Sequence, residues 1–205
     1  MELRSDLSPF VAALISEAEL IPAARKELLL RFASYVASRS HEERIALNFI
    51  CTHNSRRSHL AQIWAATAAY YYAIPNIQTF SGGTEATAFN PRAVAAMERA
   101  GFKIEAGEGD NPIYSVSFAA ETDPLQCFSK VYDHDTNPKS KFAAIMTCSD
   151  ADENCPFIPG VDLRLALTYE DPKLADDTPE ETARYDERVR QIGREIFYAF
   201  SLVNE

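Results

Sequence analysis

Hydrophobic residues at helical spacing dominate the first 43 positions of the chain. Ser8-Pro9 has the chemistry of a helix N-cap followed by a first helical residue, and Pro22 starts a second helix. The apolar stripes comprise Phe10, Val11, Leu14 and Ile15 in the first helix, and Leu28, Leu29, Phe32, Tyr35 and Val36 in the second. Two short amphipathic helices cannot bury an apolar face alone. We therefore predict that residues 1–43 form a helical extension that packs on the main domain or on a second copy of the chain, as a homodimer.

From Arg44 the pattern changes to short apolar runs that alternate with helical segments. The runs cover residues 45–50, 77–80, 142–147 and 163–167, and they have the character of buried parallel strands. Asn90-Pro91 opens one intervening helix and Gly101 closes it, while a capping box at Thr178–Glu181 starts a long final helix. Strand and helix in alternation predict an α/β domain over residues 44–205, with right-handed crossovers and a four-stranded parallel sheet.

Residues 105–140 interrupt this alternation. Tyr114, Val116 and Phe118 alternate with serines, and a second alternating run covers residues 125–132 after the turn at Glu121–Pro124. Alternation of this kind on both sides of a turn predicts a β-hairpin inserted into the domain.

The charge of the chain limits the partners it can take. The formal net charge of −10 argues against nonspecific binding to nucleic acid or to an anionic membrane. No stretch approaches the roughly 20 apolar residues that span a bilayer, and the start of the chain lacks the pattern of a signal peptide. We therefore expect a cytoplasmic protein, in which the four cysteines are catalytic, redox-active or incidental and do not form a disulfide framework. We expect no metal and no cofactor.

Cys51 ends the first apolar run and begins a loop that leads into a helix. Backbone N–H groups between a strand end and a helix start converge on one point, and the positive end of the helix dipole adds to them. The planar guanidinium of Arg57 can bind two oxygens of the anion at once. The Ser58 hydroxyl can donate a hydrogen bond to the Cys51 sulfur, and surroundings of this kind favour the thiolate. We predict that Cys51 attacks a tetrahedral oxyanion held by Thr52, His53, Asn54, Ser55, Arg56, Arg57 and Ser58, with the His53 side chain directed away from it.

Three further residues follow the ends of predicted strands. Asp171 comes after the fourth strand, so it should lie on the same sheet edge as Cys51, where it could act as a general acid. Cys148 ends the third strand and Cys155 follows it after a polar, acidic segment. Their spacing fits neither a thioredoxin-like motif nor a usual zinc site, which leaves a redox relay or plain packing as alternatives. Cys127 lies on the predicted hairpin and is expected to be a packing residue.

These motifs occur in the order found in one family. Residues 44–200 resemble the low-molecular-weight tyrosine phosphatase superfamily, and especially its thioredoxin-coupled arsenate reductase branch. The matching stretches are Cys51–Ser58, Ser81–Ala86, Phe89–Val94, Cys148–Pro156 and Asp171-Pro172. The resemblance implies a three-layer α/β fold and excludes residues 1–43 and the hairpin.

The resemblance also implies a reaction. Cys51 would attack arsenate, Cys148 would attack Cys51 and release arsenite, and Cys155 would move the disulfide to a position that thioredoxin reduces. The rival is a protein-tyrosine phosphatase that hydrolyses phosphotyrosine through a Cys51 phosphocysteine, with Asp171 as general acid. A third alternative is a noncatalytic oxyanion-binding or redox-sensing module.

Overall fold

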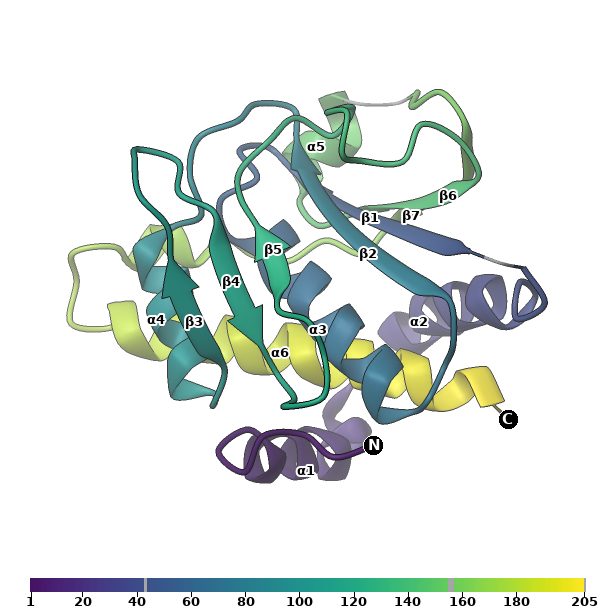
Figure 1. Ribbon diagram of the computed structural model, residues 1–205, viewed down its shortest axis with the longest axis horizontal. Coiled ribbons are helices and arrows are strands. Elements are labelled where there is room, and N and C mark those ends of the chain that lie inside the picture. Colours follow the sequence, from purple (N-terminus) through teal and green to yellow (C-terminus); the bar gives the residue numbers. More distant parts are fainter. Residues whose placement is uncertain (43, 155–156, 205) are drawn as a thin grey trace.

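A four-stranded parallel sheet forms the centre of the molecule (Figure 1). The computed structural model describes residues 1–42, 44–154 and 157–204. The strands are β1 (Ile45–Cys51), β2 (Ile77–Gly83), β6 (Phe142–Met146) and β7 (Val161–Ala166), in the order β2-β1-β6-β7. Each coincides with a predicted apolar run, which confirms the α/β prediction. The carboxyl ends of the strands meet at one edge, where Cys51 pairs with Gly83 of β2.

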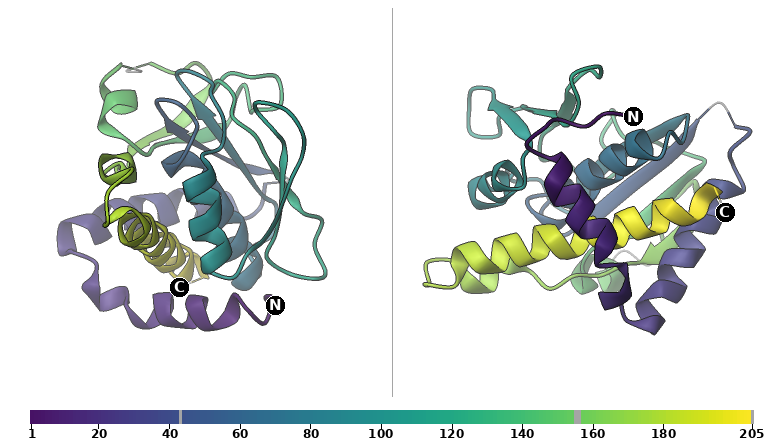
Figure 2. Two further views of the ribbon diagram at one scale, coloured as in Figure 1. Left: turned by 90° about the vertical axis from the view of Figure 1, so that its left-hand side faces the viewer. Right: turned by 90° about the horizontal axis from the view of Figure 1, so that it is seen from below.

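Helices cover both faces of this sheet, which gives three layers (Figure 2). One face packs on α2 (Ala23–Ala37), α3 (Arg57–Tyr71) and α6 (Glu181–Ser201), and the other on the short α5 (Ser149–Asn154) and the segments around it. Side chains of β1 alternate accordingly: Leu47 and Phe49 enter the larger core, and Ala46 enters the smaller one. Among the described residues, no helix is long and apolar enough to cross a membrane.

The N-terminal helices pack on the main domain, the first of the two predicted alternatives. Helix α1 (Ser8–Ser16) crosses α6, with Leu14 fully buried at the crossing (Figure 2). A Cβ atom at Gly193 of α6 would lie 2.7 Å from Leu14 Cδ1 and 2.8 Å from Trp64 Cε2, so the close approach depends on this glycine. The predicted N-cap is wrong by one residue: Leu7 caps α1, and Ser8 Oγ instead donates to the Arg4 carbonyl at 3.1 Å.

The insertion is a small antiparallel sheet of three strands. Strands β4 (Tyr114–Ser117) and β5 (Leu125–Cys127) form the predicted hairpin, and β3 (Lys103–Ala106) adds to its edge. The second strand of the hairpin ends at Cys127, earlier than the sequence pattern predicts. Beyond it the chain turns to the main sheet, where Gly83 donates to the Lys130 carbonyl at 2.9 Å. The insertion therefore ends against the loop that follows β1.

The helix boundaries follow the sequence signals in one case and depart from them in another. Asn90 caps α4 (Pro91–Arg99), accepting a hydrogen bond from Arg92 N at 2.9 Å, and Gly101 follows with φ of 107°, both as predicted. The capping box does not form at the start of α6. The Glu181 carboxylate accepts from Asp177 N at 2.7 Å, which closes the preceding turn, and the helix begins at Glu181 itself.

Candidate active site

The loop between β1 and α3 turns its carbonyl groups outward. The Thr52 carbonyl accepts from Glu85 N at 2.8 Å, and the Ser55 carbonyl accepts from Asn90 N at 2.8 Å. In a trans peptide the N–H points opposite to the C=O, so the N–H groups of this loop face its interior. The first turn of α3 adds its own free N–H groups and the positive end of its dipole. The backbone thus forms a cradle for an anion, with Cys51 at its edge.

Strand β2 supports this loop from behind through Gly83. A Cβ atom built at Gly83 would lie 2.2 Å from the Glu85 carbonyl oxygen, 2.7 Å from Asn54 N and 2.7 Å from the Thr52 carbonyl oxygen. Contacts that short do not occur in proteins, so any larger residue must displace the loop. The glycine at the end of β2 is therefore a requirement of the site's geometry.

Asn54 connects the insertion with Cys51. Its φ is 44°, a left-handed conformation that Asn tolerates, and its Oδ1 accepts from Lys130 N at 2.9 Å. Its Nδ2 donates to Ser58 Oγ at 2.8 Å, and Ser58 Oγ lies 3.1 Å from Cys51 Sγ. Because Ser58 Oγ accepts from Asn54, its single proton is free to be donated to the sulfur. This hydrogen-bonded chain places a hydroxyl donor 3.1 Å from the Cys51 sulfur.

Arg57 joins the loop to the candidate acid. Its Nη1 donates to the Tyr169 carbonyl at 3.0 Å, and its Nη2 forms an ion pair with Asp171 Oδ2 at 2.7 Å. The Arg57 side chain is 10% exposed and the Asp171 side chain 27%, so the pair lies at the mouth of the loop. Asp171 Oδ1 also accepts from Lys173 N at 3.1 Å, which fixes the carboxylate at the start of a 3-10 helix (Pro172–Ala175).

Arg56 points away from the loop. Its Nε donates to the Tyr185 hydroxyl at 2.8 Å, and its Nη2 lies 3.4 Å from Asp176 Oδ2. Tyr185 in turn donates to Asp176 Oδ1 at 2.7 Å, and burial raises the pKa of this phenol to about 12, so it remains a donor. Arg56 was expected to be an oxyanion ligand, but its guanidinium joins the loop to the segment before α6.

His53 lies on the outer side of the loop. Its side chain is half exposed, with Nε2 3.7 Å from Glu85 Oε2. Its carbonyl accepts from Ser129 Oγ at 3.0 Å, so a second residue of the insertion supports the loop. The direction of the His53 side chain agrees with the sequence-based expectation.

Cys148 is fully buried next to the loop. Its sulfur lies 3.4 Å from Thr52 Oγ1 and 3.4 Å from Ala151 N, and it belongs to the same buried cluster as Cys51. Cys155, the predicted third member of the relay, lies outside the described residues. Cys127 is buried on β5, where burial raises the pKa of its thiol to about 12. Within the described part of the chain, no group of three or more His, Cys, Asp or Glu residues is arranged to hold a metal.

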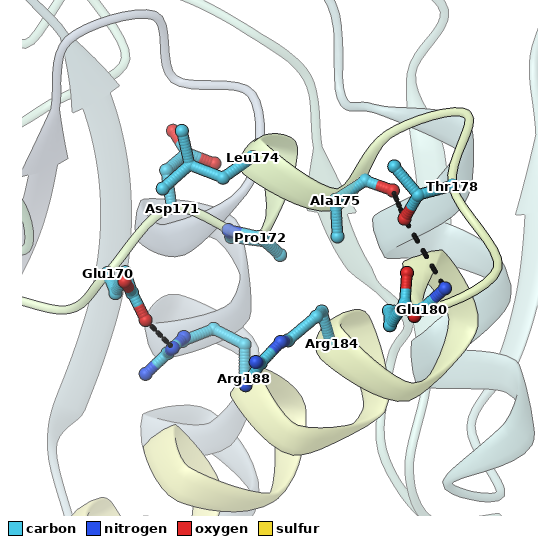
Figure 3. Close-up of a pocket in the computed structure, with 9 residues that line it drawn as sticks. All are labelled: Glu170, Asp171, Pro172, Leu174, Ala175, Thr178, Glu180, Arg184 and Arg188. Atoms are coloured by element: carbon cyan, nitrogen blue, oxygen red, sulfur yellow. Dashed lines mark hydrogen bonds and ion pairs between the residues drawn. The ribbon is translucent and has the colours of Figure 1, made fainter.

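A cavity of about 490 Å³ lies beside Asp171, between the 3-10 helix and α6 (Figure 3). Arg184 and Arg188 of α6 line it, together with Glu170 and the exposed Leu174. Arg188 is 5% exposed, and its burial, with a contribution from the charge of Arg57, lowers its pKa. The sequence analysis missed this residue, although an arginine next to Val189 on the apolar face of the final helix was a usable signal.

A buried cysteine at a strand end, beside a helix N-terminus and an arginine–carboxylate pair, is the arrangement expected of a cysteine-dependent enzyme that acts on oxyanions. An arsenate reductase of Bacillus licheniformis is 31% identical over 149 residues, which cover 72% of this chain and 89% of the relative. An arsenate reductase of Bacillus subtilis is 30% identical over 149 residues, which again cover 72% of this chain and 89% of the relative. The chain belongs to the arsenate reductase family. No family profile matches it.

Solved structures agree on the fold. A low-molecular-weight phosphotyrosine phosphatase from Vibrio cholerae superposes with a TM-score of 0.51 at 14% identity, covering 75% of this chain and 93% of its own. A YwlE mutant from Bacillus subtilis gives a TM-score of 0.53 at 12% identity, covering 78% and 99%. These likenesses confirm the predicted three-layer fold.

Proposed function

We propose that the protein reduces arsenate to arsenite, with Cys51 as the nucleophile and Cys148 as the thiol that completes the reduction. The burial of the Cys148 sulfur beside Thr52, 3.4 Å from a side chain of the oxyanion loop, carries this proposal. Hydrolysis of a phosphate ester needs one thiol, whereas reduction by two electrons needs a pair. A second thiol kept next to the nucleophile therefore favours reduction.

In the first step the Cys51 thiolate attacks arsenic(V). A bond forms between sulfur and arsenic, one oxygen of arsenate leaves as water after protonation, and arsenic remains in its oxidised state. The loop N–H groups and the Arg57 guanidinium stabilise the charge on the remaining oxygens. We assign the proton donor to the Asp171 carboxyl, which lies 2.7 Å from the Arg57 guanidinium and would share the oxyanion with it.

In the second step the Cys148 thiolate attacks the Cys51 sulfur. A disulfide forms, the sulfur–arsenic bond breaks, and its electron pair stays on arsenic, which leaves as arsenite. Cys155 then attacks Cys148, which frees Cys51 and gives a Cys148–Cys155 disulfide. Thioredoxin is the expected reductant of that disulfide and is oxidised in turn. Helix α5, which follows Cys148, has only six residues, too few to be stable alone, so its conformation depends on contacts such as the Asp152–Arg164 ion pair at 2.6 Å.

The test is arsenate-dependent oxidation of reduced thioredoxin. Cys51→Ser and Cys148→Ser should each abolish turnover, because each removes one of the two thiols that supply electrons. Cys127→Ala is the matched control, since this cysteine is also buried but lies on β5 of the insertion. Turnover that survives in Cys148→Ser would contradict the relay.

The phosphatase remains the second candidate, and the position of Asp171 favours it. A general acid for the ester oxygen is needed at the mouth of the loop, and the Asp171 carboxylate is held there by Arg57. In this case Asp171→Asn should lower aryl phosphate hydrolysis by about 10²–10⁴-fold, the usual contribution of a general acid. Vigorous hydrolysis together with no arsenate turnover would decide for the phosphatase.

A further inference from the structure

A buried ion pair joins the N-terminal extension to the core of the domain. Arg25 Nε of α2 lies 2.8 Å from Glu195 Oε2 of α6, and the Glu195 side chain is only 2% exposed. A carboxylate at that depth needs a charged partner, because leaving it unpaired costs several kcal/mol. Arg25 is therefore the residue that permits a carboxylate at this place in the core.

The same arginine lies against a residue of the active site. Its guanidinium stacks on the ring of Tyr169, with Cζ 4.6 Å from the ring centroid, and Tyr169 is 5% exposed. The carbonyl of Tyr169 accepts the hydrogen bond from Arg57 Nη1 at 3.0 Å. Arg25 thus fixes the side chain of Tyr169, and the backbone carbonyl of Tyr169 orients the Arg57 guanidinium.

A second series of contacts runs from this ion pair along α6 towards Asp171. Gln191 Nε2 donates to Glu195 Oε1 at 3.2 Å, and Gln191 also accepts a hydrogen bond from Arg188. Arg188 Nη2 reaches Glu170 at 3.4 Å, as the dashed line in Figure 3 shows. Both routes from Arg25 end at Tyr169 and Glu170, the two residues that precede the candidate acid.

We propose that Arg25 is a positioning residue for the oxyanion site, and that the N-terminal extension thereby sets the affinity of the Cys51 loop for oxyanions. Without Arg25 the Tyr169 ring loses its stacking partner, and the unpaired Glu195 charge lies beneath it. The Tyr169 carbonyl then no longer fixes Arg57, and small displacements of such a group weaken binding strongly. The proposal rests on the proposed function only in taking this loop as the oxyanion site.

The test measures how inorganic phosphate protects Cys51 from alkylation by iodoacetamide. The main variant is the double substitution Arg25→Met with Glu195→Gln, which removes the ion pair without leaving a buried charge. It should raise the half-protecting phosphate concentration about tenfold, equivalent to about 1.4 kcal/mol of binding. Arg25→Lys keeps a charge beside Glu195 and should recover part of the loss. Arg31→Met, at an exposed position of the same helix, should leave protection unchanged.

The outcomes separate this inference from the proposed function. A folded double variant with wild-type phosphate protection would overturn the positioning role. Failure of both the double variant and Arg25→Lys to fold, with Arg31→Met folded, would make Arg25 a stability residue and overturn it too. Wild-type protein that phosphate protects but that does not turn over arsenate would overturn the proposed reduction alone.

Discussion

The ion pair between Asp171 and Arg57 makes the candidate acid a competitor of the oxyanion. Asp171 Oδ2 lies 2.7 Å from Arg57 Nη2, the group that must turn to the oxyanion when it binds. An entering anion has to break this pair and then lie next to a second negative charge. Asp171→Asn removes both penalties while keeping nearly the same shape. We therefore predict that this variant binds phosphate more tightly than the wild type.

The size of the effect follows from the geometry of the pair. Two unit charges with centres about 4 Å apart attract by about 4 kcal/mol at the effective dielectric constant near a protein surface. The Asp171 side chain is 27% exposed, so water screens part of this energy. A remainder of about 1–2 kcal/mol corresponds to about 5–30-fold tighter binding.

Phosphate protection of Cys51 from iodoacetamide measures this affinity without requiring turnover. Asp177→Asn is the matched control, because Asp177 is 86% exposed and pairs with Arg92 rather than with the loop. The control should leave the half-protecting concentration unchanged. Equal or weaker phosphate binding in Asp171→Asn would refute the competition, and would mean that the carboxylate supports the loop more than it opposes the anion.

Two other predictions concern the loop and the buried histidine behind it. Gly83→Ala should displace Asn54 and reduce Cys51 alkylation and turnover by about 10²-fold. Gly109→Ala strains a backbone φ of 98°, but its added Cβ meets nothing within 4 Å, so it should lower stability and spare both readouts. Normal activity in Gly83→Ala would contradict the packing argument. His59 is fully buried, and burial, aided by the charge of Lys130, lowers its pKa from 6.5 to about 3. Its neutral form therefore contributes stability above pH 6.5 that is lost as pH falls towards 3, by up to about 1.4 kcal/mol per pH unit. Urea unfolding of His59→Phe should show a shallower pH dependence over this range, and an unchanged slope would count against the assignment.

The sequence predicted the central sheet because its signals are local. Each buried parallel strand is a short apolar run, and the residues after it must meet at one edge of the sheet, which brings Cys51 and Asp171 together without any knowledge of the loops. The Asn90 cap is likewise read from residue type. These are the parts of the site that depend on nearest neighbours in sequence or on strand order.

The direction of long side chains could not be predicted in this way. Arg56 and Arg57 are adjacent and chemically alike, yet one binds Tyr185 and the other binds Asp171. Their partners are 114 or more positions away in sequence, and only the packing of α6 determines which guanidinium meets which partner. The capping box failed for a local reason, because the Glu181 carboxylate accepts from Asp177 N, one residue before the expected Thr178 N.

The insertion and the N-terminal extension each reach a different half of the site. The insertion holds the oxyanion loop from behind, through Lys130 N on Asn54 and Ser129 Oγ on the His53 carbonyl. The N-terminal extension reaches the acid segment through Arg25. Arg57 Nη2 lies 2.7 Å from Asp171 Oδ2 and Arg56 Nε lies 4.0 Å from Asp171 Oδ1, so this carboxylate links the two halves. A displacement on either side should therefore change how the Arg57 guanidinium is shared between the carboxylate and the oxyanion. We therefore predict that both segments act on the same quantity, the free energy needed to turn Arg57 from Asp171 to the oxyanion.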